Sequence, residues 1–421
     1  MSGRQSDALI GDRCSKTDSA PDGVLPSAET RRGDVGAWFA LWVLVLVSLF
    51  SFVDLRVLSL LTIDVATSLH LRDTEIGIVL GLGSAVFALL ATYPLGWMTD
   101  RLDRRIVLSG CILVWSAGTA ACGFASGFWT LFAAVLAMMA AEAGLPAVAY
   151  SAIPDLFAGR SRVSANQVFY VAMILSSAVG IAAGGAADFV LKRLKSSLPH
   201  FLDGFETWRV VFMLVAAPAP LLVLLVIFSR IGARQERPAR REIESPEPVS
   251  YQYLRDHGTA VALVITALGL YGLPFLAVLT WTPAAFVRLF GLTPFQNGIG
   301  LSLALGLGCL VGVGLAAWLM KLLMPKLGRR APMRISAVAL GASIPSCLLF
   351  VFVQSSTQGF FIVGLLMATG TLIGSLLPEI LQSLAPPFLR GRMVAVYGIV
   401  SVITGGLGVS FVGPIADHLP G

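Results

Sequence analysis

Long apolar segments alternate with short polar ones along most of the chain. Eleven of them contain about twenty or more mostly apolar residues, the length that an α-helix needs to cross a ~30 Å hydrocarbon layer. Membrane-spanning β-strands need only about ten residues, so segments of this length predict helices. The predicted spans are 37–66, 75–98, 106–125, 128–153, 164–189, 208–231, 259–287, 296–323, 332–353, 358–384 and 392–415.

The basic residues between these spans predict the orientation of the chain. If the N-terminus is cytoplasmic, the tail and the cytoplasmic loops hold 23 of the 30 lysines and arginines, and the outer loops hold 6. Cytoplasmic loops of membrane proteins are enriched in Lys and Arg in this way. The sequence therefore predicts a multi-pass protein of the plasma (inner) membrane with a cytoplasmic N-terminus.

Two longer polar segments divide the chain. Residues 1–36 lack the apolar core of a secretory signal, so we expect a disordered cytoplasmic tail. Residues 232–258, which include GARQERPARREIESPEPVSYQYLRD, are charged and contain prolines. We expect this segment to be a cytoplasmic linker between a six-helix bundle at 37–231 and a second helical bundle at 259–421. The predicted fold class is an all-α membrane protein with two helical bundles.

The composition agrees with a membrane protein and excludes several other classes. Charged residues make up 13% of the chain and hydrophobic residues 56%, whereas soluble domains contain about 25% charged residues. The net charge of +6 does not indicate nucleic-acid binding, because the basic residues lie mostly in short loops. The cysteines and histidines show no metal-ligand spacing, and the sequence contains no phosphate-binding loop. We therefore expect no metal, no cofactor and no enzymatic activity.

The loop after the second span reads GWMTDRLDRR. It resembles the loop signature of the major facilitator superfamily, whose members are transporters with two bundles and normally twelve spans, although Asp103 stands where that family usually has glycine. We expect Asp100 to accept hydrogen bonds from a helix N-terminus and Arg101 to interact with Asp155. The alternative is that the basic residues only orient the chain. The residues assigned to this loop network are Gly96, Asp100, Arg101, Arg104, Arg105 and Asp155.

Four further stretches are similar to the spinster-like branch of that superfamily: FVDLRVLSLLTIDVATSLHLRDTEIG, AEAGLPAVAYSAIPDLF, WTPAAFVR and LQSLAPPFLRGR. The resemblance covers most of residues 37–415 and implies a transporter of a lipid-like or amphiphilic organic anion. The chain departs from the family in having eleven predicted spans rather than twelve. It also departs at Leu55 and Val135, where the family usually has arginine. Arg56 follows Leu55 directly, which makes it a candidate substitute for the missing charge.

Two acidic residues lie deep inside predicted spans. Asp54 is about 25 Å along the first span, at 1.5 Å per residue, and Glu142 lies near the middle of the fourth. Ionisable residues at such depth are costly and mark ion pathways, and a buried carboxyl group can bind a proton near neutral pH. The resemblance implies proton coupling for acids at these positions. The alternative is a static ion pair with Arg56 that holds helices together.

The candidates for substrate binding are Arg56, Tyr271, Trp281 and Glu379. Arg56 is two residues from Asp54, so it points to a different side of the helix, toward another helix, an anionic substrate group or Glu142. Tyr271 and Trp281 either line a cavity or pack between helices. Glu379 lies near the end of the tenth span and either contacts substrate or only caps the helix.

The resemblance, together with the residues described above, implies a secondary transporter in the lipid bilayer, which we expect to be a monomer. We expect it to move a small organic or amphiphilic solute, coupled to protons, by alternating access of the two bundles. One alternative is a drug or organic-anion transporter of the same superfamily. Another is a membrane sensor or scaffold that transports nothing, although the acids in two spans argue against it.

Overall fold

The computed structural model describes residues 35–157, 159–194, 204–232, 247–384 and 390–418. Every regular element in these ranges is a helix, and 11 helical segments are long and apolar enough to cross a membrane. The predicted fold class and number of spans are therefore confirmed. The predicted cytoplasmic tail lies almost entirely outside the described residues.

In the N-terminal half, several spans are interrupted. The second span consists of α3 and α4, which meet at Gly81, and the fourth consists of α6 and α7, which meet at Ala143. Pro218 stands between α9 and α10, where its missing N–H group interrupts the helical hydrogen bonds. The helices are α1 Val35–Leu60, α2 Thr62–Leu69, α3 Asp73–Leu80, α4 Leu82–Arg101, α5 Arg104–Gly123, α6 Phe128–Glu142, α7 Gly144–Leu156, α8 Gly159–Leu194, α9 Thr207–Ala216 and α10 Ala219–Phe228.

The C-terminal half has longer, less interrupted helices. They are α11 Glu247–Phe290, α12 Pro294–Leu327, α13 Ala331–Leu349, α14 Ser356–Leu384 and α15 Arg390–His418. Because α11 begins at Glu247, part of the predicted linker, 232–258, is helical. Pro248 stands in the first turn of α11, where a proline costs a helix no internal hydrogen bond.

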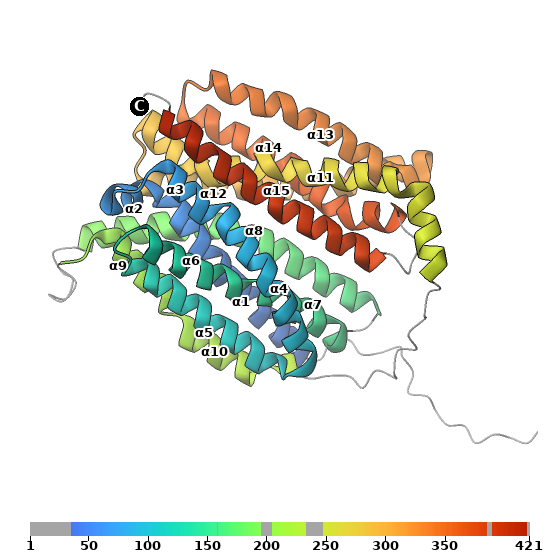
Figure 1. Ribbon diagram of the computed structural model, residues 1–421, viewed down its shortest axis with the longest axis horizontal. Coiled ribbons are helices and arrows are strands. Elements are labelled where there is room, and N and C mark those ends of the chain that lie inside the picture. The colour runs from blue at the N-terminus through green and yellow to red at the C-terminus, as the bar shows by residue number, and fades with distance from the viewer. Residues whose placement is uncertain (1–34, 158, 195–203, 233–246, 385–389, 419–421) are drawn as a thin grey trace, which may run out of the picture.

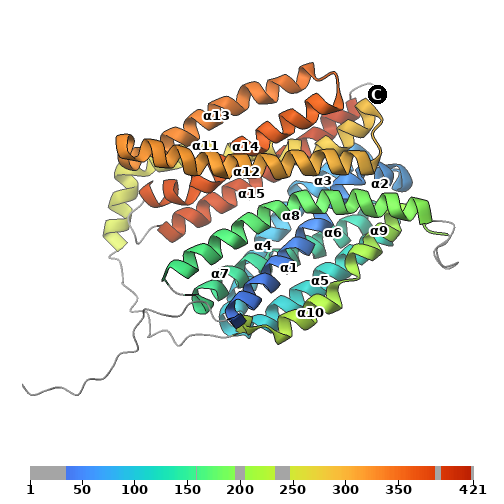
Figure 2. The same ribbon diagram turned by 180° about the vertical axis from the view of Figure 1, so that it is seen from behind.

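The two halves pack side by side along two seams. Figure 1 shows α15 against α3 and α4, and Figure 2 shows α8 against α12 on the opposite side. Small residues let the α8 and α12 backbones approach closely. A Cβ atom added at Gly185 of α8 would lie 2.7 Å from the carbonyl oxygen of Pro294. Glycine is therefore required at this point of the seam.

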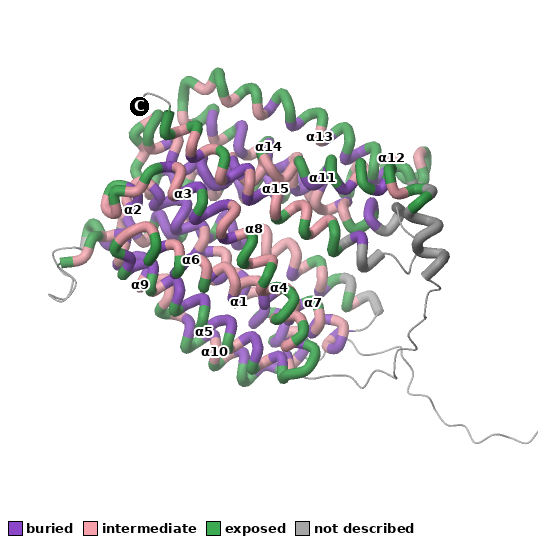
Figure 3. Tube along the Cα trace, viewed as in Figure 1, coloured by how far each residue is buried: buried purple, intermediate pink, exposed green. Residues whose placement is uncertain are grey.

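Buried residues concentrate inside each half and along the seams (Figure 3). Large apolar side chains such as Val338 and Phe361 are exposed around the outside. Such a surface suits contact with lipid hydrocarbon, which has no hydrogen bonds to offer.

The helix termini define two ends of the molecule. The α2 end contains α2, the start of α3 and the end of α15. The linker end contains the turn between α4 and α5, the end of α7 and Gly232. Charged residues bridge the halves at the α2 end, and the predicted loop network lies at the linker end.

Candidate functional site

Asp54 is buried in the N-terminal half, where Thr119 is its hydrogen-bond partner. The residue is 2% exposed, and its Oδ2 accepts a hydrogen bond of 2.6 Å from Thr119 Oγ1 on α5. Thr119 Oγ1 is also 3.0 Å from the carbonyl oxygen of Trp115. A hydroxyl group has one proton to donate, so Thr119 donates to Asp54 when that carboxyl group is ionised. When Asp54 is protonated it can donate to Thr119, which then donates to Trp115.

Glu142 lies at the break in the fourth span. It is the last residue of α6, and α7 begins after Ala143. Its Oε1 is buried without a hydrogen-bond partner in the described part of the chain, and Ser51 of α1 lies beside the same carboxyl group. A buried polar atom without a partner is costly. This carboxyl group is therefore suited to taking up a proton or another ligand.

Glycine allows the broken fourth span to lie against α5. A Cβ atom at Gly144 would overlap the Sγ atom of Cys111. The helix break after Glu142 therefore lies in close contact with α5, and this contact requires glycine at position 144.

Arg56 is buried on another face of α1. It is 5% exposed and lies near enough to Glu142 for an electrostatic interaction. Among the described residues, neither acid forms an ion pair with it within 4.0 Å. The static Asp54–Arg56 pair, which the sequence left open as an alternative, is therefore absent. Asp54, Arg56 and Glu142 thus lie close together without a direct ion pair to one another.

The two positions that depart from the family pattern lie next to this group. Val135 is fully buried in α6, two turns before Glu142. Leu55 is half-buried and lies between Asp54 and Arg56. Arg56 thus approaches Glu142 from α1, whereas an arginine at position 135 would belong to α6, the helix that ends at Glu142.

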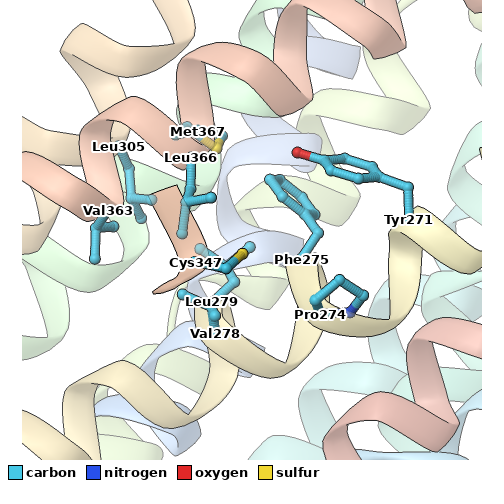
Figure 4. Close-up of a pocket in the computed structure, with 10 residues that line it drawn as sticks. All are labelled: Tyr271, Pro274, Phe275, Val278, Leu279, Leu305, Cys347, Val363, Leu366 and Met367. Carbon is cyan, nitrogen blue, oxygen red and sulfur yellow. The ribbon is translucent and has the colours of Figure 1, made fainter. Parts of the chain in front are cut away.

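In the C-terminal half, an apolar pocket lies between α11, α12, α13 and α14 (Figure 4). Tyr271 and Phe275 of α11 line it and stack on each other, with ring centroids 5.7 Å apart. The other lining residues are aliphatic or sulfur-containing, among them Cys347 and Met367. The lining is apolar apart from the hydroxyl group of Tyr271.

The other two substrate candidates lie in different surroundings. Trp281 is 7% exposed, and its Nε1 donates a hydrogen bond of 2.9 Å to the carbonyl oxygen of Val409 on α15. This bond joins two helices of one half and supports the packing alternative. Glu379 is exposed near the end of α14, and the described residues show no contact between it and Asp54, Arg56 or Glu142.

The loop network lies at the linker end, but Asp155 has a different partner from the predicted one. Arg104 donates to Asp155 at 2.7 Å, and both residues are buried. Arg101 instead packs over the ring of Trp97, 4.5 Å from the ring centroid. Arg104 is the first residue of α5 and so lies inside the bundle, whereas Arg101 is exposed at the end of α4.

The helix cap in this loop is also different from the prediction. Asp103, rather than Asp100, caps α5, accepting a hydrogen bond of 2.8 Å from the backbone N–H of Arg105. Asp103 has an extended backbone (φ −62°, ψ 126°), which does not require the glycine that the family usually has there. Arg105 also donates to the carbonyl oxygen of Ile227, at 3.3 Å. Gly96 lies within α4 with open space where a Cβ would stand.

The sequence did not identify Thr119. It is one of many hydroxyl residues in apolar segments, and it lies 65 positions from Asp54. Only the folded arrangement of the N-terminal half brings the two side chains, on α1 and α5, within hydrogen-bond distance.

Comparison with known proteins identifies the family. The Major Facilitator Superfamily model matches residues 44–409. An MFS-type efflux pump of Mycolicibacterium smegmatis is 24% identical over 407 residues, which cover 95% of this chain and 90% of that protein. The sphingosine-1-phosphate transporter SPNS2 of Danio rerio is 24% identical over 393 residues, which cover 88% of this chain and 74% of that protein.

Solved structures show the same fold. A bacterial homologue of the human lysosomal transporter Spinster, in an inward-facing and unoccupied conformation, aligns with a TM-score of 0.77 and 21% identity, covering 91% of this chain and 83% of that one. A D-xylose–proton symporter aligns with a TM-score of 0.63 and 16% identity, covering 90% of each chain. The family match runs from α1 to α15, and the chain therefore belongs to the Major Facilitator Superfamily of membrane transporters.

Proposed function

We propose that this protein is a secondary active transporter that couples proton movement to the passage of a small organic or amphiphilic solute by alternating access. The observation that carries the proposal is the group formed by Asp54, Arg56 and Glu142 inside the N-terminal half. These residues lie deep in two spans and form no direct ion pair among the described residues. Charged groups inside a membrane are expensive and are typical of ion and substrate pathways.

Two local features support proton exchange at this group. Thr119 can satisfy Asp54 in both protonation states, as an ionised acceptor or as a protonated donor. Glu142 lies at a helix break, and interrupted helices near the membrane midplane are typical of binding sites in secondary transporters. In this proposal, Arg56 interacts electrostatically with Glu142, and an anionic substrate competes with Glu142 for Arg56.

The proposed substrate class is an amphiphilic anion. Arg56 supplies a positive charge from the N-terminal half, and the pocket at Tyr271 and Phe275 supplies apolar surface from the C-terminal half. One relative is by name a transporter of sphingosine-1-phosphate. Lipid phosphates are therefore a suitable first set of test compounds.

We propose that the protein lies in the plasma membrane with its linker end facing the cytoplasm. The excess of lysines and arginines in the loops at that end supports it. The α2 end would then face outward, and contacts between the halves close it in this conformation. We propose that the protein acts as a monomer.

Proteoliposomes with an imposed pH gradient would test the coupling. Glu142→Gln removes the titratable group with little change of shape, and we expect pH-driven accumulation of the substrate to fall by at least about tenfold. Glu206→Gln is the matched control, because Glu206 is an exposed carboxylate outside the spans of the same half. Unchanged pH-driven accumulation in the Glu142 variant would refute proton coupling through this residue.

A second candidate function is drug efflux. The relative from Mycolicibacterium smegmatis is an efflux pump, and the aligned residues cover 90% of its length. In this case Glu142 and Asp54 would attract cationic drugs, and Arg56 would weaken their binding. Cells producing the protein would accumulate less of a fluorescent cationic dye, whereas uptake of lipid phosphates would not change. A sensor or scaffold would change neither flux.

A further inference from the structure

A groove runs along the outside of the C-terminal half, between α12 and α14. The two helices lie side by side, and both begin at the α2 end (Figure 2). The groove is lined by residues within 300–311 of α12 and 357–368 of α14, and we call it the α12–α14 groove. Its volume is about 500 Å³, within the range of ~300–1,000 Å³ that is typical of sites for small organic ligands.

Small residues form the floor of the groove on both helices. On α12 these are Gly300, Ala304 and Gly308, which are spaced four residues apart and therefore lie on one face of the helix. On α14, Gly364 and Ala368 have the same spacing. A Cβ atom at Gly308 would overlap the carbonyl oxygen of Gly364. The small side chains thus allow the two backbones to touch, and they leave open space on the outer side of this contact.

Larger apolar side chains form the two rims. Leu303 and Leu307 of α12 and Phe361 of α14 line the groove, and each is more than half exposed. Within the described part of the chain, no charged residue lines the groove, and the side chain with a polar group is Thr357, in the first turn of α14. The groove is therefore suited to a flexible hydrocarbon chain, with polar contact only at the α2 end.

The length and position of the groove match one leaflet of a bilayer. Residues 300–311 and 357–368 each extend roughly 16 Å along their helix at 1.5 Å per residue, and one leaflet provides half of the ~30 Å hydrocarbon thickness. Both stretches lie almost entirely in the half of their helix that is nearer the α2 end. A helix of a second copy would contact the surface over the full thickness, so the length of the groove favours a single acyl chain.

We propose that the α12–α14 groove binds one acyl chain of a bilayer lipid, in the leaflet at the α2 end, with the lipid head group near Thr357. The groove opens on the exposed apolar surface that suits contact with lipid hydrocarbon, so bilayer lipid has direct access to it. Hydrocarbon contains no water to be released, and the preference for the groove therefore comes from van der Waals contact. A chain in the groove contacts the floor and both rims, whereas a chain on an open helix face has protein on one side.

Photo-crosslinking of a lipid tests this site. The protein would be reconstituted in nanodiscs that contain phosphatidylcholine with a diazirine in the middle of one acyl chain, and labelled residues would be identified by peptide mass spectrometry. Labelling of the α14 rim, at Phe361 and Leu365, is compared with labelling of Ile344 and Leu348 on the exposed face of α13. These pairs lie at similar depth, because α13 ends and α14 begins at the α2 end. We expect at least about fivefold more label on the α14 rim, because the bound chain makes more van der Waals contacts there.

Two variants change the groove in opposite ways. Leu303→Ala combined with Leu307→Ala lowers the α12 rim at exposed positions, and Ala304→Leu fills the floor. We expect each to reduce labelling of the α14 rim by at least about threefold, because the chain loses contacts in the first and space in the second. Ile344→Ala combined with Leu348→Ala is the control on α13, and labelling of the α14 rim should stay within about twofold of the parent value. Melting temperature and monodispersity confirm that each variant is folded.

Equal labelling of the α14 rim and the α13 face in the parent would overturn the proposal, and so would unchanged labelling of the α14 rim in Leu303→Ala with Leu307→Ala. A dimer in mass photometry of the nanodiscs that this double variant converts to a monomer would assign the groove to a second copy, which would also overturn the proposal. The groove shares no lining residue with the pocket at Tyr271, and the assay uses neither substrate nor a pH gradient. Its outcome is therefore independent of the proposed transport function.

Discussion

The two halves of this transporter are similar helical bundles with different interiors. The charged residues buried in the described part of the chain all belong to the N-terminal half: Asp54, Arg56, Asp73, Arg104, Asp155 and Asp188. In the described part of the C-terminal half the buried polar residues are uncharged, for example Thr280, Asn297 and Thr371. From this difference we infer that protons and charged substrate groups interact with the N-terminal half, and that apolar substrate groups bind to the C-terminal half.

This division has an energetic basis. Each charged group in the N-terminal half gives up hydration, so it needs neighbouring charges or hydrogen bonds to be stable. The C-terminal half carries no such cost in its described interior, and its pocket is held by contact between apolar side chains. We therefore expect substitutions in the first half to change coupling and stability together, and substitutions in the second half to change mainly affinity.

The largest effect is expected for Arg56→Met. This variant leaves Asp54 and Glu142 without the nearby positive charge, so we expect transport to be lost and the melting temperature to fall. The cost in stability should be about 2 kcal/mol, below the ~3–5 kcal/mol typical of a direct buried ion pair, because Arg56 and Glu142 are not in direct contact. Thermal unfolding and flux measurements on the same sample would check both results.

A second substitution shows whether the charges are responsible. Adding Glu142→Gln to Arg56→Met removes an unbalanced carboxylate and should restore much of the stability but none of the transport. Arg193→Met, at an exposed arginine of the same half, is the matched control. If Arg56→Met is as stable and active as the parent, the buried charges of the N-terminal half do not have the role proposed for them.

A smaller effect is expected for Thr119→Val, which keeps the shape of the side chain but removes its hydroxyl group. The Asp54 carboxylate then loses its 2.6 Å hydrogen bond, and hydrogen bonds to charged groups contribute about 1.5–3 kcal/mol. We expect pH-driven transport to fall about tenfold and its pH profile to change. Thr119→Ser should behave like the parent; a serine variant as impaired as the valine variant would show that packing, not hydrogen bonding, matters here.

Phe275→Ala tests the apolar half. The aromatic ring lines the pocket and stacks on Tyr271, so its loss should raise the KM for an amphiphilic substrate about tenfold, equivalent to about 1.4 kcal/mol of binding. The number of protons moved per substrate should stay the same. Phe361→Ala, at an exposed ring that does not line this pocket, controls for general damage. A change in coupling stoichiometry would contradict the separation of roles.

The sequence was most informative about features that repeat along the chain. Span length and loop charge predicted an all-α membrane protein with eleven spans, and that prediction is confirmed. The isolated charges drew attention to Asp54 and Glu142, but their surroundings depend on contacts between distant helices. Thr119 was missed for this reason. Arg101 was expected beside Asp155, whereas the packing of α5 on α7 brings Arg104 there.

Glu379→Gln should have the smallest effect and is a sensitive test of the comparison. Glu379 is the acidic candidate in the C-terminal half, but it is exposed, and the described residues show no contact between it and the buried charges of the other half. Neutralising an exposed carboxylate typically changes free energies by well under 1 kcal/mol, so flux and KM should remain within about twofold of the parent values. Glu142→Gln provides the contrast, because it makes the same chemical change at a buried carboxyl group. A tenfold loss of pH-driven flux in the Glu379 variant would mean that the C-terminal half supplies an acid in another conformation, and charge handling would then belong to both halves.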